Sequence, residues 1–246
     1  MDLSARSTLP ERMDDADLPL AVYRRCLADL ARLNRVTMTH RATVRWLARA
    51  TRRWPAEQPM VILDVACGHG DLLHEIAAWA KSRGFIARLS GIDLNPRATA
   101  EARSATDPAL AQPAFHTADV FAYRPDVRPD FIVTSQFTHH LPDAEVVRLL
   151  RWMEQTARAG WVIADLHRHW FPYYGFRWLA RAAGWHPIVR SDGTVSIARA
   201  FTKGDWERLL RAADLRPGID AEVRWQFPFR ISVMRRKAMA RPGVRL

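Results

Sequence analysis

The sequence predicts an α/β fold built on a Rossmann-like, mostly parallel sheet of seven strands. Short runs of continuous apolar residues alternate with amphipathic segments from Met60 onwards, as in strands that helices cover on both faces. A turn rich in small residues joins the first strand to the next helix, as in open sheets that bind ligands at the carboxyl ends of their strands. The chain has 246 residues, enough for one sizeable domain with additions.

The first part of the chain is expected to form a helical cap. Residues 1–17 are polar, carry no signal-peptide core and are expected to be flexible. Apolar side chains then recur at helical spacing over Leu18–Leu33 and Met38–Arg53. The stretch "RRWPAEQP" breaks this pattern. We therefore assign residues 18–55 to a cap that precedes the main domain.

The main domain is expected over residues 56–246, and strands alternate with helices in its first half. The dipeptide Asn95-Pro96 is a typical start of a helix. In chain order, strands are expected over 60–65, 85–93, 114–120, 130–137 and 160–166, and helices over 71–83, 96–104 and 143–157.

An aromatic-rich insert, residues 167–201, interrupts the alternation after the fifth strand. Its segment Tyr173–Ala183 is expected to be helical. We interpret the insert as packed on the sheet edge and, on its other face, as a lid over an apolar or aromatic ligand. The next helix begins with a capping box of Thr202 and Asp205. A closing pair of strands, one of them antiparallel to the parallel set, is expected over 219–227 and 229–236.

The net charge of +11 first suggests a nucleic-acid partner. The basic residues are nearly all arginines spread along the chain, with no long basic run, so a nucleic-acid partner is disfavoured. The densest basic stretch runs from Phe229 to Leu246 and could contact an anionic membrane surface or nucleic acid, but a solvated basic tail after the last strand is the favoured interpretation. Cys26 and Cys67 have neither metal-ligand spacing nor a disulfide pattern, and the apolar runs are too short to span a bilayer. A cytoplasmic location is expected, and the sequence gives no indication of the oligomeric state.

The stretch "VILDVACGHGDLLHEI", from Val61 to Ile76, reads as a strand, a tight turn and a helix. Small residues at Ala66, Gly68 and Gly70 would let the backbone approach a ligand closely, and the helix N-terminus favours an anionic group. Asp93 ends the next strand, and its carboxylate can accept two hydrogen bonds from a ribose diol. The pattern predicts a site for a nucleoside-containing cofactor.

An acid precedes the glycines in "DVACGHG", and this stretch resembles the first motif of the class I S-adenosylmethionine-dependent methyltransferases, with Ala66 in place of the first glycine. "GIDLNP", "TADVF" and "DFIVTSQFTHHLPD" resemble the second, third and fourth motifs of that family, in the same order. The resemblance implies S-adenosylmethionine as the cofactor, with Asp64 near its amino group, Asp93 on the ribose and Asp119 at the adenine. The other cofactor contacts that it implies are Ala66, Cys67, Gly68, Gly70, Leu94, Val120 and Gln136.

Four further stretches narrow the resemblance to a bacterial subgroup. They are the start "PERMDDADLPLAVYRRCLADLARLNRVT", then "ADLHRH", "SDGTVSIARAFT" and "VRWQFPFR". Members of this subgroup are similar to ubiquinone and menaquinone methyltransferases and are often encoded near type III polyketide synthases. The resemblance implies a small phenolic, quinol or polyketide-like acceptor.

Candidate catalytic residues are His139 and His140, which follow the fourth strand. A neutral imidazole suits a general base near pH 7, and His140 is favoured because related methyltransferases often have a single histidine before this leucine. The alternative is that one histidine caps the next helix and the other packs. The substrate side is assigned to His167, Trp170, Tyr173 and Tyr174.

No metal site is expected, because the carboxylate set of metal-dependent methyltransferases has no counterpart here, although a cluster of His139, His140, His167 and His169 is conceivable. Cys67 is not expected to be a nucleophile, since the sequence places no activating base beside it.

The predicted function is methyl transfer to a small apolar or aromatic acceptor, with O-methylation favoured. C-methylation of a quinone-like ring, a nucleic-acid methyltransferase and a non-catalytic cofactor-binding protein are the alternatives. The fourth motif lacks an "NPPY"-like sequence, which disfavours a nucleic-acid substrate, and the glycine spacing disfavours an NAD-dependent reductase.

Overall fold

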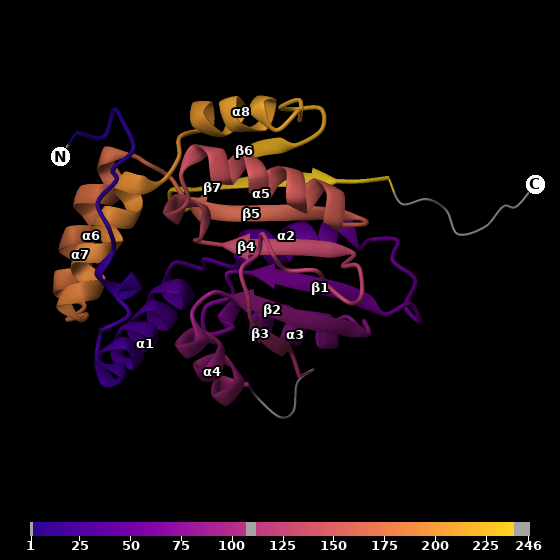
Figure 1. The fold of residues 1–246 in the computed structure, drawn as a ribbon, viewed down its shortest axis with the longest axis horizontal. Coiled ribbons are helices and arrows are strands. Elements are labelled where there is room, and N and C mark those ends of the chain that lie inside the picture. Colours follow the sequence, from indigo (N-terminus) through magenta and orange to yellow (C-terminus); the bar gives the residue numbers. More distant parts are fainter. Residues whose placement is uncertain (1, 107–111, 239–246) are drawn as a thin grey trace, which may run out of the picture.

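The computed structural model describes residues 2–106 and 112–238 and contains one seven-stranded sheet of order β3-β2-β1-β4-β5-β7-β6 (Figure 1). Neighbouring strands from β3 to β5 are parallel, while β7 runs antiparallel to both β5 and β6. The strands are β1 (Met60–Val65), β2 (Ala87–Asp93), β3 (Ala114–Thr117), β4 (Phe131–Ser135), β5 (Gly160–Leu166), β6 (Glu222–Gln226) and β7 (Arg230–Arg236). The predicted mostly parallel sheet with an antiparallel closing strand is confirmed.

The helices follow the expected alternation and add one that the sequence did not predict. They are α1 (Leu20–Val36), α2 (Arg41–Ala50), α3 (Asp71–Ser82), α4 (Pro96–Ala105), α5 (Asp143–Thr156), α6 (Trp170–Ala182), α7 (Pro187–Arg199) and α8 (Lys203–Ala212), with short 3-10 helices η1 (Arg12–Asp14) and η2 (Thr138–His140). Thr202 and Asp205 form the expected capping box at the start of α8. No helix in the described ranges is long and apolar enough to cross a membrane.

Two apolar cores lie on opposite faces of the sheet. Side chains alternate between the two faces along a strand, so neighbouring residues join different cores. Leu63 and Ile132 pack in the core that α5 and α8 cover, whereas Ile62 and Val133 pack in the core of α2 and α3. Burial on both faces explains why these strands read as continuous apolar runs in the sequence.

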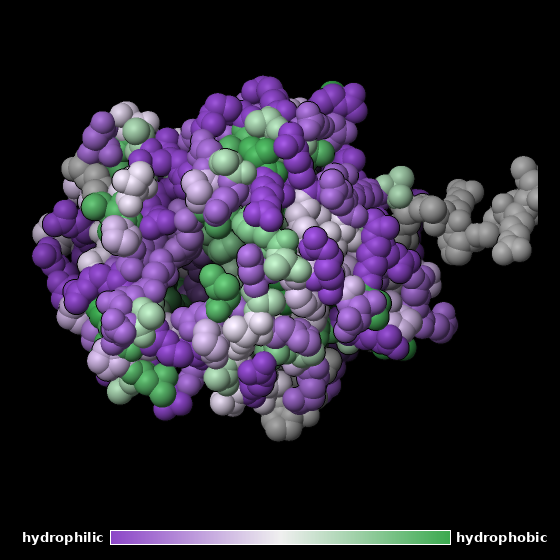
Figure 2. Space-filling model, viewed as in Figure 1, coloured by the Kyte–Doolittle hydropathy of each residue, from purple (hydrophilic) through white to green (hydrophobic). Residues whose placement is uncertain are grey.

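Helices α1, α6 and α7 form a separate layer beside the carboxyl ends of the parallel strands (Figure 1). Their shared core contains Cys26 and Leu33 of α1, Ala180 of α6, and Ile188 and Val189 of α7. Figure 2 shows a recess between this helical layer and the sheet. The helical layer is therefore placed to cover the sheet edge at which the parallel strands end.

Helix α7 went unpredicted because buried residues occur on more than one of its faces and leave no simple amphipathic pattern. It begins at Pro187 after His186, whose imidazole accepts the backbone N–H of Ile188. Its Gly193 lies against the ring of Phe176 on α6, where an added Cβ would lie 2.2 Å from a ring carbon. Helices α6 and α7 are thus packed closely at this glycine.

The segment before α1 makes specific contacts with the rest of the chain. The Arg6 guanidinium donates to Asp143 at 2.7 Å and to the backbone carbonyl of Leu141, and Arg168 donates to the carbonyl of Leu3. These contacts hold residues 3–6 against the loop after β4 and the start of α6. The domain boundaries at residues 17 and 55 and the lid role of residues 167–201 stay predictions.

Candidate active site at the carboxyl edge of the sheet

The turn after β1 adopts a backbone conformation that requires small residues. Ala66, Gly68 and Gly70 have φ values of 55°, 54° and 84°, in the left-handed region that side chains disfavour. A Cβ at Gly70 would also lie 2.8 Å from the ring of Phe115. At Gly68 an added Cβ would meet nothing within 4 Å. The turn is therefore tight on its inner side and open beside Gly68, as a close-approaching ligand would need.

Asp93 is bonded to this turn. One of its carboxylate oxygens accepts the backbone N–H of Gly68 at 2.9 Å, and the other accepts that of Asn95 at 2.8 Å. Each oxygen keeps a further lone pair. Burial raises the pKa of Asp93 despite these two hydrogen bonds. The carboxylate is thus held rigidly beside the turn and can still accept hydroxyl donors.

Asp64 and Cys67 are both buried near the same turn. In the described part of the chain, Oδ1 of Asp64 has no hydrogen-bond partner, and burial, with the nearby charges of Asp71 and Asp93, raises its pKa well above the usual range. Burial also raises the pKa of the Cys67 thiol, whose sulfur would lie 2.7 Å from a Cβ at Gly91. Asp64 therefore has a carboxyl oxygen that lacks a hydrogen-bond donor among the described residues. Cys67 packs in the core, and its thiol is not activated.

Helix α1 reaches over Asp93. The phenol oxygen of Tyr23 accepts a hydrogen bond from the Asn95 side chain at 3.3 Å, and Arg97 stacks over the Tyr23 ring. Burial, followed by the charge of Asp93, raises the pKa of Tyr23 to about 12. Helix α1 therefore covers Asp93, the acid that the sequence assigns to the ribose.

A second contact links the cap to the glycine turn through Asp71, the first residue of α3. Its carboxylate accepts hydrogen bonds from His40 at 2.9 Å and from the Asn34 amide at 2.7 Å. Gln136, just after β4, donates to the carbonyl oxygen of the Asn34 side chain at 2.9 Å. Burial raises the pKa of Asp71, but the hydrogen bond and charge of His40 outweigh it and the net shift is downward. Two cap residues thus connect the ends of β1 and β4.

The remaining predicted cofactor residues lie at the ends of β2 and β3. Leu94 is 74% exposed, and Val120 is buried in the core that α5 covers. Asp119 is exposed, and its Oδ1 accepts the backbone N–H of Phe121 at 2.9 Å. They share the sheet edge with Asp93, because the backbone N–H of Ala118 bonds the carbonyl of Asp93.

His139 lies in a buried cluster of carboxylates. Its Nδ1 donates to Asp165 at 2.8 Å, and its Nε2 lies 3.4 Å from Oε1 of Glu11. Burial would lower the pKa of His139, but the charges and hydrogen bonds of Asp165 and Glu11 raise it to about 10. The same pairing lowers the pKa of Asp165 to about 2 against its own burial. His139 is therefore a cation near neutral pH, with no free lone pair for a proton.

His140 is the more accessible of the two predicted catalytic histidines. Its side chain is 27% exposed, and its Nδ1 donates to Asp14 at 3.1 Å. Its Nε2 lies 3.8 Å from Oε1 of Glu11. The charge of His140 also opposes the upward pKa shift of Asp93, so the histidine lies within electrostatic range of the predicted ribose site.

The predicted substrate residues separate into buried and exposed ones. Tyr173 is buried against Ile197 and Ala198 of α7, whereas Trp170 and Tyr174 are 61% and 46% exposed. Burial lowers the pKa of His167, whose Nδ1 has no hydrogen-bond partner among the described residues. Among the residues that the structure describes, no hydrogen bond or ion pair joins these four side chains to His139 or His140.

Sequence reasoning missed Glu11, Asp14 and Asp165, which surround the two histidines. Asp165 lies one residue before the end of β5 and could have been found, because acids at the carboxyl ends of parallel strands meet at one edge. Glu11 and Asp14 lie in the polar start "ERMDD", and no local pattern links that start to residues 139 and 140.

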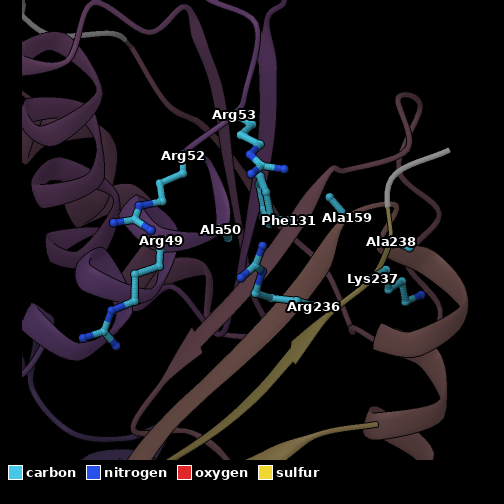
Figure 3. A pocket seen from close by; sticks show the side chains of 9 residues that line it. All are labelled: Arg49, Ala50, Arg52, Arg53, Phe131, Ala159, Arg236, Lys237 and Ala238. Atoms are coloured by element: carbon cyan, nitrogen blue, oxygen red, sulfur yellow. The ribbon is translucent and has the colours of Figure 1, made fainter. Parts of the chain in front are cut away.

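The cavity drawn in Figure 3 lies at the opposite, amino edge of the parallel strands. It measures about 570 Å³ and has Phe131 and Ala159 among its lining residues. Four exposed arginines around it have no hydrogen-bond or ion-pair partner among the described residues: Arg49, Arg52, Arg53 and Arg236. This cavity is cationic and separate from the glycine turn.

Residues 38–217 match the family model described as "Methyltransferase domain". That match covers most of the chain, including the glycine turn, Asp93 and both histidines. No curated protein matches the sequence significantly.

Solved structures with a similar fold include several methyltransferases. The plantazolicin methyltransferase BpumL, in complex with a pentazolic desmethylPZN analog and SAH, aligns with a TM-score of 0.64 and 13% identity over 88% of this chain and 91% of that one. The magnesium protoporphyrin IX methyltransferase ChlM from Synechocystis PCC 6803, with bound SAH, gives 0.54 and 16% over 92% and 91%. Human N-acetylserotonin methyltransferase with SAM gives 0.59 and 16% over 91% and 60%. Because the sequence identities are this low, the similarity to these structures shows a shared fold alone.

Proposed function

The chain belongs to the methyltransferase-domain family, and from this premise we propose that it transfers the methyl group of S-adenosylmethionine to a small apolar or aromatic acceptor. The observation that carries the proposal is the bond between Asp93 and the backbone N–H of Gly68. It joins a hydroxyl-accepting carboxylate to a small-residue turn, which suits a ribose on one side and the remainder of a nucleoside cofactor on the other.

We assign three parts of the cofactor to three acidic residues. Asp64 would accept a hydrogen bond from the methionine amino group, which would satisfy its unpartnered Oδ1. Asp93 would hold the ribose, and Asp119 would accept from the adenine amino group. The accompanying contacts would come from Ala66, Cys67, Gly68, Gly70, Leu94, Val120 and Gln136.

The cofactor supplies the electrophilic methyl group, and the protein has to hold the acceptor in line with it. Much of the acceleration would come from this positioning and from the exclusion of water by the helical layer. We propose O-methylation of a phenolic, quinol or polyketide-like acceptor, with Trp170 and Tyr174 on the acceptor side together with His167 and Tyr173. The bacterial subgroup similar to quinone methyltransferases remains part of this proposal, and C-methylation is its alternative.

His140 is the proposed general base. It is partly exposed, and Asp14 holds Nδ1, which leaves Nε2 to accept the acceptor's proton. His139 is unsuited to this role near neutral pH, because its raised pKa of about 10 keeps it protonated. Its charge would instead stabilise negative charge that develops nearby.

Calorimetry of the purified protein with S-adenosylmethionine and with NAD tests the cofactor. We expect binding of S-adenosylmethionine and none of NAD; the absence of S-adenosylmethionine binding would refute the proposal. A screen of phenols, quinols and alkylresorcinols with methyl-labelled cofactor then tests the acceptor class. Cofactor binding without transfer to any of these acceptors would contradict the proposed substrate class and leave the cofactor assignment intact.

Contact with an anionic membrane surface also stays a proposal. Part of the basic stretch that suggested it, residues 239–246, lies outside the described residues. In the described part, the exposed arginines in Figure 3 adjoin this stretch, since its residues Arg236, Lys237 and Ala238 line the same cavity. Unpaired cations on one face favour an anionic surface.

A further inference from the structure

Three side chains, one from the segment before α1 and two from η2, bring their ligand atoms close together. Glu11, His139 and His140 each offer one such atom, and these atoms all lie within 4.8 Å of one another. Oε1 of Glu11 is 3.4 Å from Nε2 of His139 and 3.8 Å from Nε2 of His140. Two ligand atoms that share a tetrahedral zinc ion at bond lengths near 2.1 Å are separated by about 3.4 Å. The two distances from Oε1, 3.4 and 3.8 Å, are therefore close to those between two ligands of one zinc ion.

One oxygen of the Glu11 carboxylate, Oε1, lacks a hydrogen-bond donor of good geometry among the residues that the structure describes. The Glu11 side chain is only 8% exposed, and within the described ranges its buried Oε1 accepts no hydrogen bond. Such an oxygen is costly to bury unless a cation lies beside it. Oε1 lies near both Nε2 atoms, so either the protonated His139 or a metal cation among the three atoms would satisfy it.

The far sides of both imidazoles are held by carboxylates. Nδ1 of His139 donates to Asp165 at 2.8 Å, and Nδ1 of His140 donates to Asp14 at 3.1 Å. This arrangement fixes each ring and leaves Nε2 as the nitrogen that can bind a metal, as in carboxylate–histidine–zinc arrangements. Arg199 donates to the backbone carbonyls of both histidines and fixes their main chain.

We propose that Glu11, His139 and His140 bind a divalent first-row transition-metal ion, with Zn²⁺ as the best match. Two imidazoles and one carboxylate suit zinc and leave a fourth position open. This inference departs from the expectation of no metal, because Glu11 lies in a segment that the sequence did not connect to the histidines. It goes beyond methyl transfer and does not depend on it.

Metal and proton compete for the same nitrogens. Zinc binds the imidazole nitrogen only in its deprotonated form, so a proton on Nε2 leaves when the metal binds. A metal on Nε2 of His140 would likewise block the proton transfer proposed for that atom. Metal loading should therefore release protons and change any His140-dependent activity.

The test uses the full chain, stripped with a chelator and titrated with Zn²⁺ and with Co²⁺. We expect one equivalent of each to bind, with proton release in calorimetry and with the visible absorption of tetrahedral Co²⁺. Glu11→Gln should weaken binding at least tenfold, since it removes the charged ligand. His116→Ala, which removes an exposed histidine outside the cluster, is the control and should bind as the unaltered protein does.

A Glu11 variant could lose the fold of its segment, so His140→Ala provides a second variant at a partly exposed position. Equal zinc affinity in the unaltered protein and in a folded Glu11→Gln or His140→Ala variant would overturn the proposal, as would the absence of stoichiometric binding. S-adenosylmethionine binding is measured on the same samples. If S-adenosylmethionine still binds when zinc does not, the metal proposal is refuted and the proposed function is not.

Discussion

Nδ1 of His139 lies 2.8 Å from a carboxylate oxygen of Asp165, and both side chains are almost fully buried. The contact follows from the sheet, because β4 and β5 are parallel neighbours with Ser135 opposite Ala164. The residues just after Ser135 therefore meet the end of β5. The consequence is an ion pair inside the protein, since the pKa of His139 rises to about 10 and that of Asp165 falls to about 2.

This ion pair should make the free energy of unfolding depend on pH. His139 titrates higher in the folded state than at its ordinary pKa of 6.5, so its stabilisation is complete below pH 6.5 and is lost as pH rises towards 10. Asp165 titrates lower than its ordinary 3.8, so its stabilisation is present above pH 3.8 and is lost as pH falls towards 2. Urea unfolding should show a stability decrease between pH 6.5 and 10.

Asp165→Asn should remove most of that dependence and cost about 3 kcal/mol near pH 6, because it removes the nearer of the two carboxylates that pair with the buried His139. The control is Asp214→Asn, which breaks an exposed pair with Arg151 and should cost less than about 1 kcal/mol. A similar stability decrease above pH 6.5 in Asp165→Asn and in the unaltered protein would contradict the assignment to this pair.

Asp93→Ala should weaken the binding of S-adenosylmethionine by about a hundredfold. It removes the carboxylate proposed for the ribose, and a hydrogen bond to a charged group contributes about 1.5–3 kcal/mol. It also releases the backbone N–H of Gly68 and so loosens the turn. Calorimetry measures the effect, with Glu57→Gln as an exposed acid control. Unchanged affinity in Asp93→Ala would refute the ribose assignment.

The sheet and its glycine turn could be predicted because their signals are local. Continuous apolar runs follow from burial on both faces, as for Leu63 and Ile62, which pack in opposite cores. The turn could be predicted because its positive φ values favour small residues, which the sequence has at Ala66, Gly68 and Gly70.

The acids around the histidines could not be predicted, because their partners are distant in the sequence. Glu11 and Asp14 meet His139 and His140 only in the folded chain, where the segment before α1 lies against α7. A polar segment has no hydrophobic periodicity from which such contacts could be predicted. The same reason hides the pairing of His40 and Asn34 with Asp71.

His40→Ala should destabilise the protein and weaken cofactor binding together. The imidazole lowers the pKa of Asp71 against the effect of burial, so its loss leaves a partly buried carboxylate near Asp64 with fewer partners. We expect a cost of about 1–3 kcal/mol in the free energy of unfolding. Urea unfolding and calorimetry measure the two effects, with His116→Ala as the control. A stable variant with full cofactor affinity would show that the contact does not hold the turn.

Vesicle binding should depend on the arginines around the cavity in Figure 3. Alanine at all four should weaken sedimentation with phosphatidylserine vesicles at least tenfold, because a basic residue near an anionic surface contributes about 1 kcal/mol. The four are Arg49, Arg52, Arg53 and Arg236. The control removes four arginines that carboxylates already pair, namely Arg208, Arg211, Arg216 and Arg224.

Equal losses in the two arginine variants would indicate an effect of net charge alone. Equal binding of the unaltered protein to phosphatidylcholine vesicles would remove the electrostatic explanation. Either result would contradict a membrane contact at this face.

Gly193→Ala should separate α6 from α7. The added Cβ would lie 2.2 Å from the Phe176 ring, and relieving such a clash in a packed layer costs about 1–3 kcal/mol. Gly175→Ala on α6 is the matched control, because its Cβ meets nothing within 4 Å and alanine favours a helix by about 1 kcal/mol. Thermal unfolding should therefore shift in opposite directions for the two variants. If the helical layer excludes water from the acceptor, Gly193→Ala should also lower methyl transfer more than cofactor affinity; an equal loss of both would assign the layer a purely structural role.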